Sequence, residues 1–236
     1  MPFIKQHRRA DLGKNAADVE SMFSAVAPRY DLMNDIASLG QDRRWRSAVV
    51  SALAPQSGEV ILDLAAGTGT SSQAIAKTKA KVVATDLTYG MVRLGHLRYP
   101  DQCFVVGDAL HLPYADAAFD AATMSFGLRN VARPEVALRE LHRVVRPGGT
   151  LVICEFSRPT TAMTRSLYRF WLRGVMPVVA KVVSTDDEAY AYLGESIISW
   201  PDQRGLAAMM EQAGWDSIQW RNLTGGIVAL HRAIRP

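Results

Sequence analysis

The sequence predicts an α/β fold in which helices cover a mostly parallel, seven-stranded sheet that ends in an antiparallel C-terminal hairpin. Five short apolar runs alternate with helical patterns, which is the order of parallel strands joined by right-handed crossovers. The runs are apolar nearly throughout, as strands buried on both faces are. The last two runs are separated only by a short turn, and strands joined that closely pair antiparallel.

The five parallel strands are predicted first along the chain. They cover residues 60–65, 81–86, 103–108, 119–126 and 150–156. Helical patterns accompany them at 71–78, 88–99 and 134–145. Pro134 suits the first turn of the third of these helices, and the segment RPGG at 146–149 is expected to end it.

The C-terminal part breaks the alternation. A helix at 201–214 leads into strands at 216–223 and 227–233, with the turn TGG between them. We therefore predict one domain of 1–236 with four parts: an N-terminal helical cap (1–59), a ligand-binding core (60–156), a helical insertion (157–200), and the final helix and hairpin (201–236). Open α/β sheets bind ligands at the carboxyl ends of their strands, and the cap and the insertion could cover that crevice.

Composition and charge are those of a soluble globular protein. The chain has 236 residues, a formal charge of +4 and no apolar stretch that suggests a secretory signal or a membrane-spanning helix, so we expect a cytoplasmic location. The basic residues are scattered, which argues against a nucleic-acid partner. Cys103 and Cys154 lie in apolar runs and are expected to be reduced, buried thiols.

The loop that follows the first predicted strand points to a nucleotide-like ligand. Gly67 and Gly69 allow tight turning and close approach of a ligand. Ser72 stands where the dinucleotide-binding pattern GxGxxG has its last glycine, and the GK[ST] ending of a phosphate-binding P-loop is absent. An NAD-dependent oxidoreductase is therefore the weaker interpretation.

Three carboxylates accompany this loop. Asp86 ends the second predicted strand, where an acid commonly holds ribose hydroxyls; Asp108 ends the third, and Asp63 lies near the loop. Three acids around one crevice would repel a pyrophosphate, but they suit a ligand with an adenosine, an ammonium group and a positive sulfur, which is S-adenosylmethionine (AdoMet). Each feature alone is weak, because a strand-end Asp can simply cap the next helix.

Several longer segments make the sequence resemble the menaquinone/ubiquinone C-methyltransferase family. The most specific are RYDLMND with the SLG and RRWR that follow it, and NLTGGIVALH near the C-terminus. The segments that carry the resemblance lie at 19–46, 61–69, 107–131, 140–159, 189–197 and 222–236.

The resemblance implies a Rossmann-like class I methyltransferase that transfers a methyl group from AdoMet to a ring carbon of a polyprenylated quinol, converting demethylmenaquinol to menaquinol. A benzoquinol or another small phenolic or lipid substrate is the alternative. The family's AdoMet-binding positions fall here on Thr68, Asp86, Asp108, Ala109 and Ser125.

Two pairs of residues are candidates for catalysis. Arg129 and Asn130 follow the fourth predicted strand, where Arg129 could stabilise the quinolate oxygen and Asn130 could fix the ring. The alternative is that Arg129 pairs with an acid and Asn130 caps the helix at Pro134. Tyr30 could hydrogen-bond the quinol and Asp31 could take its proton; alternatively, Tyr30 packs in a lid and Asp31 caps a helix.

Other polar residues are open to a structural interpretation. Trp45 is expected in the core, and Arg43 and Arg44 on a charged helix face. Glu155 either faces the crevice or pairs with Arg158. The histidines form no ligand pattern with each other or with the cysteines, so we predict no metal.

The segment 164–183 mixes aromatic and aliphatic residues with four basic ones, Arg165, Arg169, Arg173 and Lys181. That composition suits either a helix at the membrane interface that receives a prenyl tail, or a lid helix packed on the core. We therefore expect peripheral contact with the membrane surface; the oligomeric state stays open, with a homodimer among the options.

Overall fold

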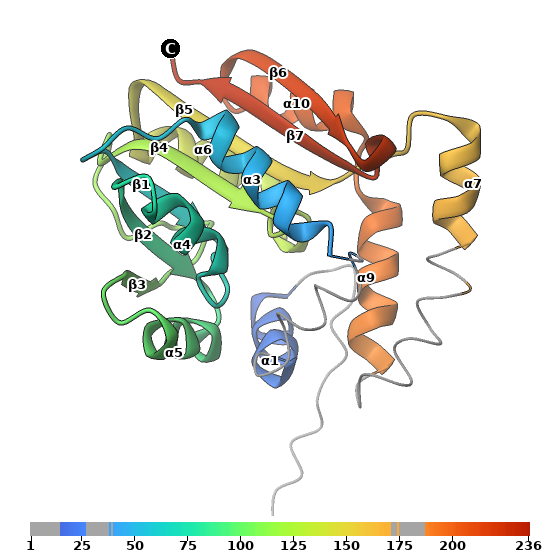
Figure 1. The fold of residues 1–236 in the computed structure, drawn as a ribbon, viewed down its shortest axis with the longest axis horizontal. Coiled ribbons are helices and arrows are strands. Elements are labelled where there is room, and N and C mark those ends of the chain that lie inside the picture. The colour runs from blue at the N-terminus through green and yellow to red at the C-terminus, as the bar shows by residue number, and fades with distance from the viewer. Residues whose placement is uncertain (1–14, 27–37, 39, 171–173, 175–186) are drawn as a thin grey trace, which may run out of the picture.

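A computed structural model describes residues 15–26, 38, 40–170, 174 and 187–236 (Figure 1). Seven strands form one sheet in the order β3-β2-β1-β4-β5-β7-β6. The strands are β1 (Val60–Leu64), β2 (Lys81–Asp86), β3 (Cys103–Val106), β4 (Phe119–Ser125), β5 (Val145–Phe156), β6 (Asp216–Leu223) and β7 (Val228–Ile234). The first five are parallel, and β7 pairs antiparallel with both β5 and β6, as the sequence predicts.

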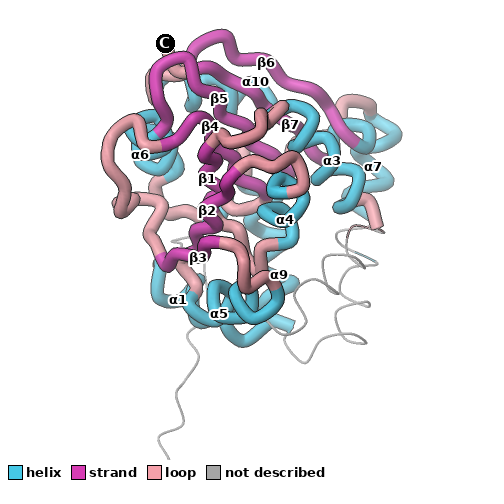
Figure 2. The backbone as a smooth tube through the Cα atoms, turned by 60° about the vertical axis from the view of Figure 1, so that its left-hand side comes forward, coloured by secondary structure: helices cyan, strands magenta, loops and turns pink. Residues whose placement is uncertain are grey.

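Helices lie on both faces of the sheet and beyond its carboxyl edge (Figures 1 and 2). The α-helices within the described residues are α1 (Ala16–Val26), α3 (Asp42–Leu53), α4 (Thr70–Ala76), α5 (Tyr89–Arg98), α6 (Pro134–Val144), α7 (Ala162–Phe170), α9 (Asp187–Ser199) and α10 (Gln203–Gln212). Two short 3-10 turns, η2 (Leu128–Asn130) and η4 (Thr224–Gly226), follow β4 and β6. Pro134 occupies the first turn of α6, as expected.

The alternation of side chains along each strand divides the core into two layers. On β1, Ile61 belongs to the same core cluster as Trp45 of α3, whereas Leu62 belongs to the cluster that contains Leu138 of α6 and Leu206 of α10. Both layers are buried, which explains why the central strands are apolar on both faces. Trp45 is thus a core residue, as predicted, and its indole N–H donates to the Thr224 hydroxyl at 2.9 Å.

Two predictions on strand details need correction. Cys154 is buried, but Cys103 is exposed, because it begins β3 at the edge of the sheet. The strand β5 starts at Val145, not at residue 150. RPGG is part of it because Gly148 N–H donates to Arg235 O and Arg235 N–H to Gly149 O, which continues the pairing with the C-terminal residues.

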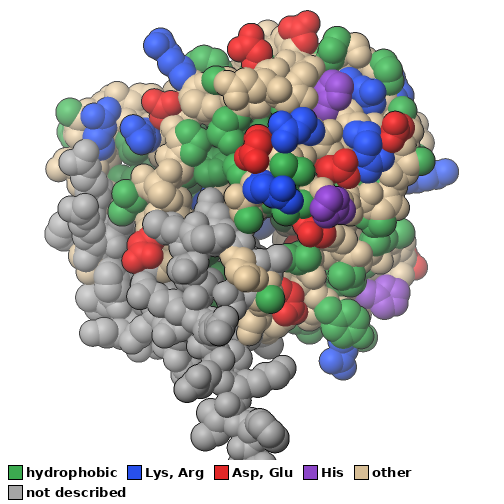
Figure 3. Space-filling model, turned by 180° about the vertical axis from the view of Figure 1, so that it is seen from behind, with side chains coloured by type: hydrophobic (Ala, Val, Ile, Leu, Met, Phe, Trp, Pro, Cys, Tyr) green, Lys and Arg blue, Asp and Glu red, His purple; other side chains and the backbone are tan. Residues whose placement is uncertain are grey.

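The surface of the described part carries both signs of charge. On the face shown in Figure 3, basic side chains lie among acidic ones and histidines. Arg43 and Arg44 are exposed on α3, as expected for a charged helix face. Among the described helices, none combines the length and the apolar character needed to cross a bilayer.

Candidate functional site

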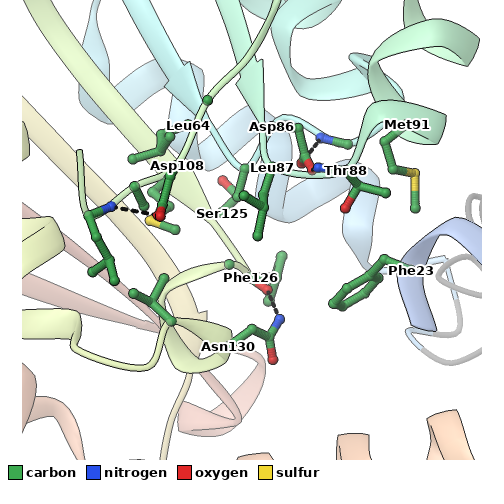
Figure 4. Close-up of a pocket in the computed structure, with 18 of the residues that line it drawn as sticks. Phe23, Leu64, Asp86, Leu87, Thr88, Met91, Asp108, Ser125, Phe126 and Asn130 are labelled. Atoms are coloured by element: carbon green, nitrogen blue, oxygen red, sulfur yellow. Dashed lines mark hydrogen bonds between the residues drawn. The ribbon is translucent and has the colours of Figure 1, made fainter. Parts of the chain in front are cut away.

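A cavity opens at the carboxyl ends of the parallel strands (Figure 4). Its empty space is about 840 Å³ when the open solvent at its mouth is included. The residues that line it are Phe23, Leu64, Ala65, Gly67, Asp86, Leu87, Thr88, Met91, Gly107, Asp108, Ala109, Leu110, Met124, Ser125, Phe126, Gly127, Asn130, Val131 and Ala132. The lining is mainly apolar, with a few polar groups placed at strand ends.

The two loop glycines serve different purposes. Gly67 lines the cavity, and its N–H donates to Asp86 Oδ2 at 2.8 Å. Gly69 begins α4 with a φ of +80° and lies outside the lining. A Cβ on Gly69 would come within 2.5 Å of the Phe104 ring, and one on Gly95 of α5 within 2.3 Å. Gly69 is therefore required by the backbone conformation at the start of α4 and by packing against Phe104. Of the two loop glycines, only Gly67 leaves space for a ligand.

Asp86 and Asp108 both reach the cavity, as predicted. Asp86 ends β2, whereas Asp108 lies in the loop two residues after the end of β3 at Val106 and not in the strand itself. Asp86 also accepts from Thr88 N–H through Oδ1 at 2.8 Å, and Asp108 accepts from Leu110 N–H at 2.9 Å. A carboxylate can accept about four hydrogen bonds, so each of these two groups can still accept one from a ligand. Burial raises the pKa of Asp86 above its usual range, and a cationic ligand would favour the ionised form.

Ser125 and Ala109 complete this wall of the cavity. Ser125 ends β4, and its hydroxyl is buried without a hydrogen-bond partner among the described residues. A buried hydroxyl that lacks a partner is costly unless a ligand or water supplies one. The residues around the cavity thus fit a ligand rich in hydrogen-bonding groups.

Asp63 and Thr68 lie behind the loop and outside the cavity lining. Asp63 is 1% exposed and accepts from the Ser72 hydroxyl at 2.6 Å. Thr68 is buried, and its hydroxyl accepts from Arg98 Nη1 at 3.3 Å. Ser72, which stands in place of the last glycine of the dinucleotide-binding pattern, is therefore the hydrogen-bond donor to Asp63 of β1. Asp63 and Thr68 support the loop from behind.

Asp63 makes stability depend on pH. Burial, with a smaller contribution from the charge of Asp86, raises the pKa of Asp63 to about 7. When the pKa of an acid is higher in the folded than in the unfolded state, the protein becomes less stable as the pH rises from the unfolded-state pKa to the folded-state pKa. We expect the free energy of unfolding to fall by about 2–3 kcal/mol between pH 5 and pH 8 because of this group.

Denaturant unfolding of the unliganded protein measures this effect, with Asp63→Asn as the comparison. Asparagine keeps an acceptor for the Ser72 hydroxyl but cannot ionise. The variant should therefore lose less stability than the wild type over the same interval. Parallel curves for the two proteins would show that Asp63 does not titrate there.

Arg129 forms an ion pair with a nearby acid, which was the alternative to a catalytic role. It is 5% exposed, and its Nη1 donates to Glu155 Oε1 at 2.8 Å and to Phe126 O. The guanidinium also lies over the Phe156 ring, 4.9 Å from its centroid. Arg129 is not among the residues that line the cavity, and Glu155 pairs with it and not with Arg158.

Asn130 lies at the cavity, as predicted. Its Nδ2 donates to Phe126 O at 3.4 Å (Figure 4), and its Oδ1 accepts from the Tyr192 hydroxyl at 3.3 Å. It does not cap α6, which begins after Arg133 without a side-chain cap. Tyr30 and Asp31 lie outside the described residues.

Most of the lining residues were not singled out from the sequence. Among them, Phe23 of α1 closes one side of the cavity, and Leu87, Thr88 and Met91 follow β2. The signal for Thr88 was its place two residues after Asp86, where an Asp side chain accepts from the backbone. No pattern marks Phe23, because its role depends on how α1 packs. Among the described residues, no group of His, Cys, Asp and Glu is arranged to hold a metal.

The fold is shared with many solved structures at low identity. The [4+2]-cyclase SpnF aligns with a TM-score of 0.70 at 18% identity, over 94% of this chain and 97% of that one. Phosphoethanolamine N-methyltransferase 2 of Haemonchus contortus, in complex with S-adenosyl-L-methionine, aligns at 0.61 and 13%, over 82% of this chain and 52% of that one. The predicted class I methyltransferase fold is confirmed.

Sequence relatives are far closer. Demethylmenaquinone methyltransferase of Streptomyces griseus is 53% identical over 227 residues, which are 96% of this chain and 99% of that protein. The protein of the same name from Mycobacterium marinum is 54% identical over 228 residues, 97% of this chain and 98% of that one. A model of the ubiE/COQ5 methyltransferase family matches residues 11–235. Because this model covers nearly the whole chain and these relatives are more than 50% identical, the chain belongs to the ubiE/COQ5 methyltransferase family.

Proposed function

We propose that this chain methylates a ring carbon of demethylmenaquinol to give menaquinol, with AdoMet as the methyl donor. The assignment of the substrate rests on the identity above 50%, over nearly the whole chain, to proteins named demethylmenaquinone methyltransferase. The cavity supports it, because acids at strand ends face an apolar interior. AdoMet supplies an electrophilic methyl group on a positively charged sulfur.

The strand-end residues would hold the donor. Asp86 would accept from ribose hydroxyls and Asp108 from the adenine amine, while the Ser125 hydroxyl gains a partner. Gly67 leaves room beside Asp86, with no side chain between the loop and the ligand. Asp63, Thr68 and Gly69 would act indirectly by keeping this loop in shape.

The opposite wall would hold the quinol ring. Phe23, Phe126 and Val131 offer apolar contacts, and Asn130 offers an amide that can fix a ring oxygen. A ring carbon becomes nucleophilic when a neighbouring hydroxyl loses its proton, so orientation and exclusion of water should supply much of the rate. Tyr30 and Asp31 stay candidates for binding and deprotonating that hydroxyl.

Arg129 has a different place in this proposal from the one predicted. Its guanidinium holds Phe126 O and Glu155 and does not line the cavity. We therefore assign it to positioning the turn from Phe126 to Asn130, and not to direct stabilisation of the quinolate. An equal loss of AdoMet affinity and turnover in Arg129→Ala would contradict a role confined to the substrate side.

Incubation with isotope-labelled AdoMet and chemically reduced demethylmenaquinone tests the function. We expect labelled menaquinone by mass spectrometry, and little or no product from the corresponding demethylated benzoquinol. Membrane extract from a strain lacking this activity provides the natural prenyl lengths. Methylation of the benzoquinol alone, or of neither quinol, would contradict the proposal.

A prenylated substrate has to be presented from a membrane. Met163 on α7 is 80% exposed and comes directly before the segment 164–183, whose composition suits an interfacial helix. We propose transient contact of this segment with the bilayer surface. Reversal of the charges at 165, 169, 173 and 181 should reduce cosedimentation with anionic liposomes; unchanged binding would remove the membrane role.

A further inference from the structure

Helix α9 approaches the substrate side of the cavity through Tyr192. This tyrosine is 3% exposed, and its hydroxyl donates to Asn130 Oδ1 at 3.3 Å. Asn130 is the only residue of the turn η2 among the cavity-lining residues described. A buried side chain 62 positions further along the chain therefore contacts a polar group that the ligand would meet.

Two hydrogen bonds hold the Asn130 amide from opposite ends. Nδ2 donates to Phe126 O at 3.4 Å, and Oδ1 accepts from Tyr192 at 3.3 Å. Both are longer than the usual 2.9–3.0 Å, so either one alone would restrain the amide weakly. Together they set the plane of the amide and the direction of the second Nδ2 hydrogen.

We propose that Tyr192 is a positioning residue, which fixes the Asn130 amide so that it orients the quinol ring beside the methyl donor. The inference rests on the proposed function and extends it to a residue that does not line the cavity. A misplacement of a fraction of an ångström in such a group lowers the rate, because transfer requires an aligned ring carbon.

Other buried residues also anchor α9. Ser196, Ile197 and Trp200 at the end of the helix are all buried. Ser196 Oγ donates to Leu193 O of the same helix at 2.9 Å. Tyr192→Phe should therefore keep the helix in place while releasing Asn130, and Ser196→Ala provides a matched loss of a buried hydroxyl that does not touch Asn130.

The test is a double-mutant cycle between Tyr192→Phe and Asn130→Ala, measured on demethylmenaquinol. We expect Tyr192→Phe to lower kcat/KM for the quinol about 3- to 10-fold, with the Kd of S-adenosylhomocysteine unchanged within about twofold. In the Asn130→Ala background the same change should have no further effect. Ser196→Ala should match the wild type.

Three results would overturn the inference: wild-type kinetics for Tyr192→Phe, an additive loss in the Asn130→Ala background, or an equal loss of cofactor affinity. If the wild type itself does not methylate demethylmenaquinol, the proposed function fails, and NMR tests the inference without substrate. The side-chain NH₂ signals of Asn130, assigned by their loss in Asn130→Ala, should shift or broaden in Tyr192→Phe; unchanged signals would refute the positioning role.

Discussion

Replacement of Asp86 by alanine is expected to weaken the binding of AdoMet and of S-adenosylhomocysteine about 100-fold. Two effects act in the same direction. The ligand loses a charged acceptor at the end of β2, where each such hydrogen bond contributes about 1.5–3 kcal/mol. The N–H groups of Gly67 and Thr88 also lose their acceptor, so the loop loses the shape that receives the ligand. Isothermal titration calorimetry with S-adenosylhomocysteine measures the change.

Asp101→Ala is the matched control for loss of a carboxylate. Asp101 is exposed and lies outside the residues that line the cavity, so its removal should leave affinity within about twofold. Asp86→Asn should also bind weakly, because its amide NH₂ would face one of the two backbone N–H donors. If Asp86→Ala weakens affinity by less than about fivefold, this carboxylate does not contact the ligand.

The second large effect concerns stability. Glu155→Ala should lower the free energy of unfolding by about 3–5 kcal/mol, because it leaves the buried Arg129 guanidinium without its counter-charge. Glu155 also accepts from the backbone N–H groups of Phe156 at 2.8 Å and Arg129 at 3.3 Å, which would lose their partner. Urea unfolding followed by circular dichroism gives the value.

Two comparisons make this prediction specific. The double variant Glu155→Ala with Arg129→Ala should recover part of the loss, since no unpaired charge remains. Asp116→Ala removes one partner of Arg143 at the surface, where the Asp116 side chain is 77% exposed, and should cost less than about 1 kcal/mol. If Glu155→Ala behaves like Asp116→Ala, the buried pair does not hold the turn after β4.

The sheet and the cofactor side of the site could be predicted from the sequence because their signals are local. Apolar runs ended by Asp86 and by Asp108 give both the strand and the point where its last side chain meets a ligand. The inferences about these two acids need only the rule that parallel strands end at one edge. Ser125, at the end of β4, was expected from the resemblance to the family and not from its own sequence pattern.

The substrate side could not be predicted in this way because its contacts join distant parts of the chain. Glu155 lies 26 positions after Arg129, and the sequence offered Arg158 as an equally good partner. Tyr192 reaches Asn130 across 62 positions. The exposure of Cys103 likewise depends on which strand forms the edge of the sheet, a choice that its own apolar run does not encode.

The ring of Phe104 occupies the space that a methyl group would need at both Gly69 and Gly95. Positions 95 and 104 should consequently covary among homologues, because alanine at 95 becomes acceptable only with a smaller residue at 104. Position 69 should stay glycine because of its positive φ. Directed evolution that randomises 95 and 104 separately would discard most clones as misfolded. Libraries that pair the two changes would keep folded clones with a new packing between α5 and β3.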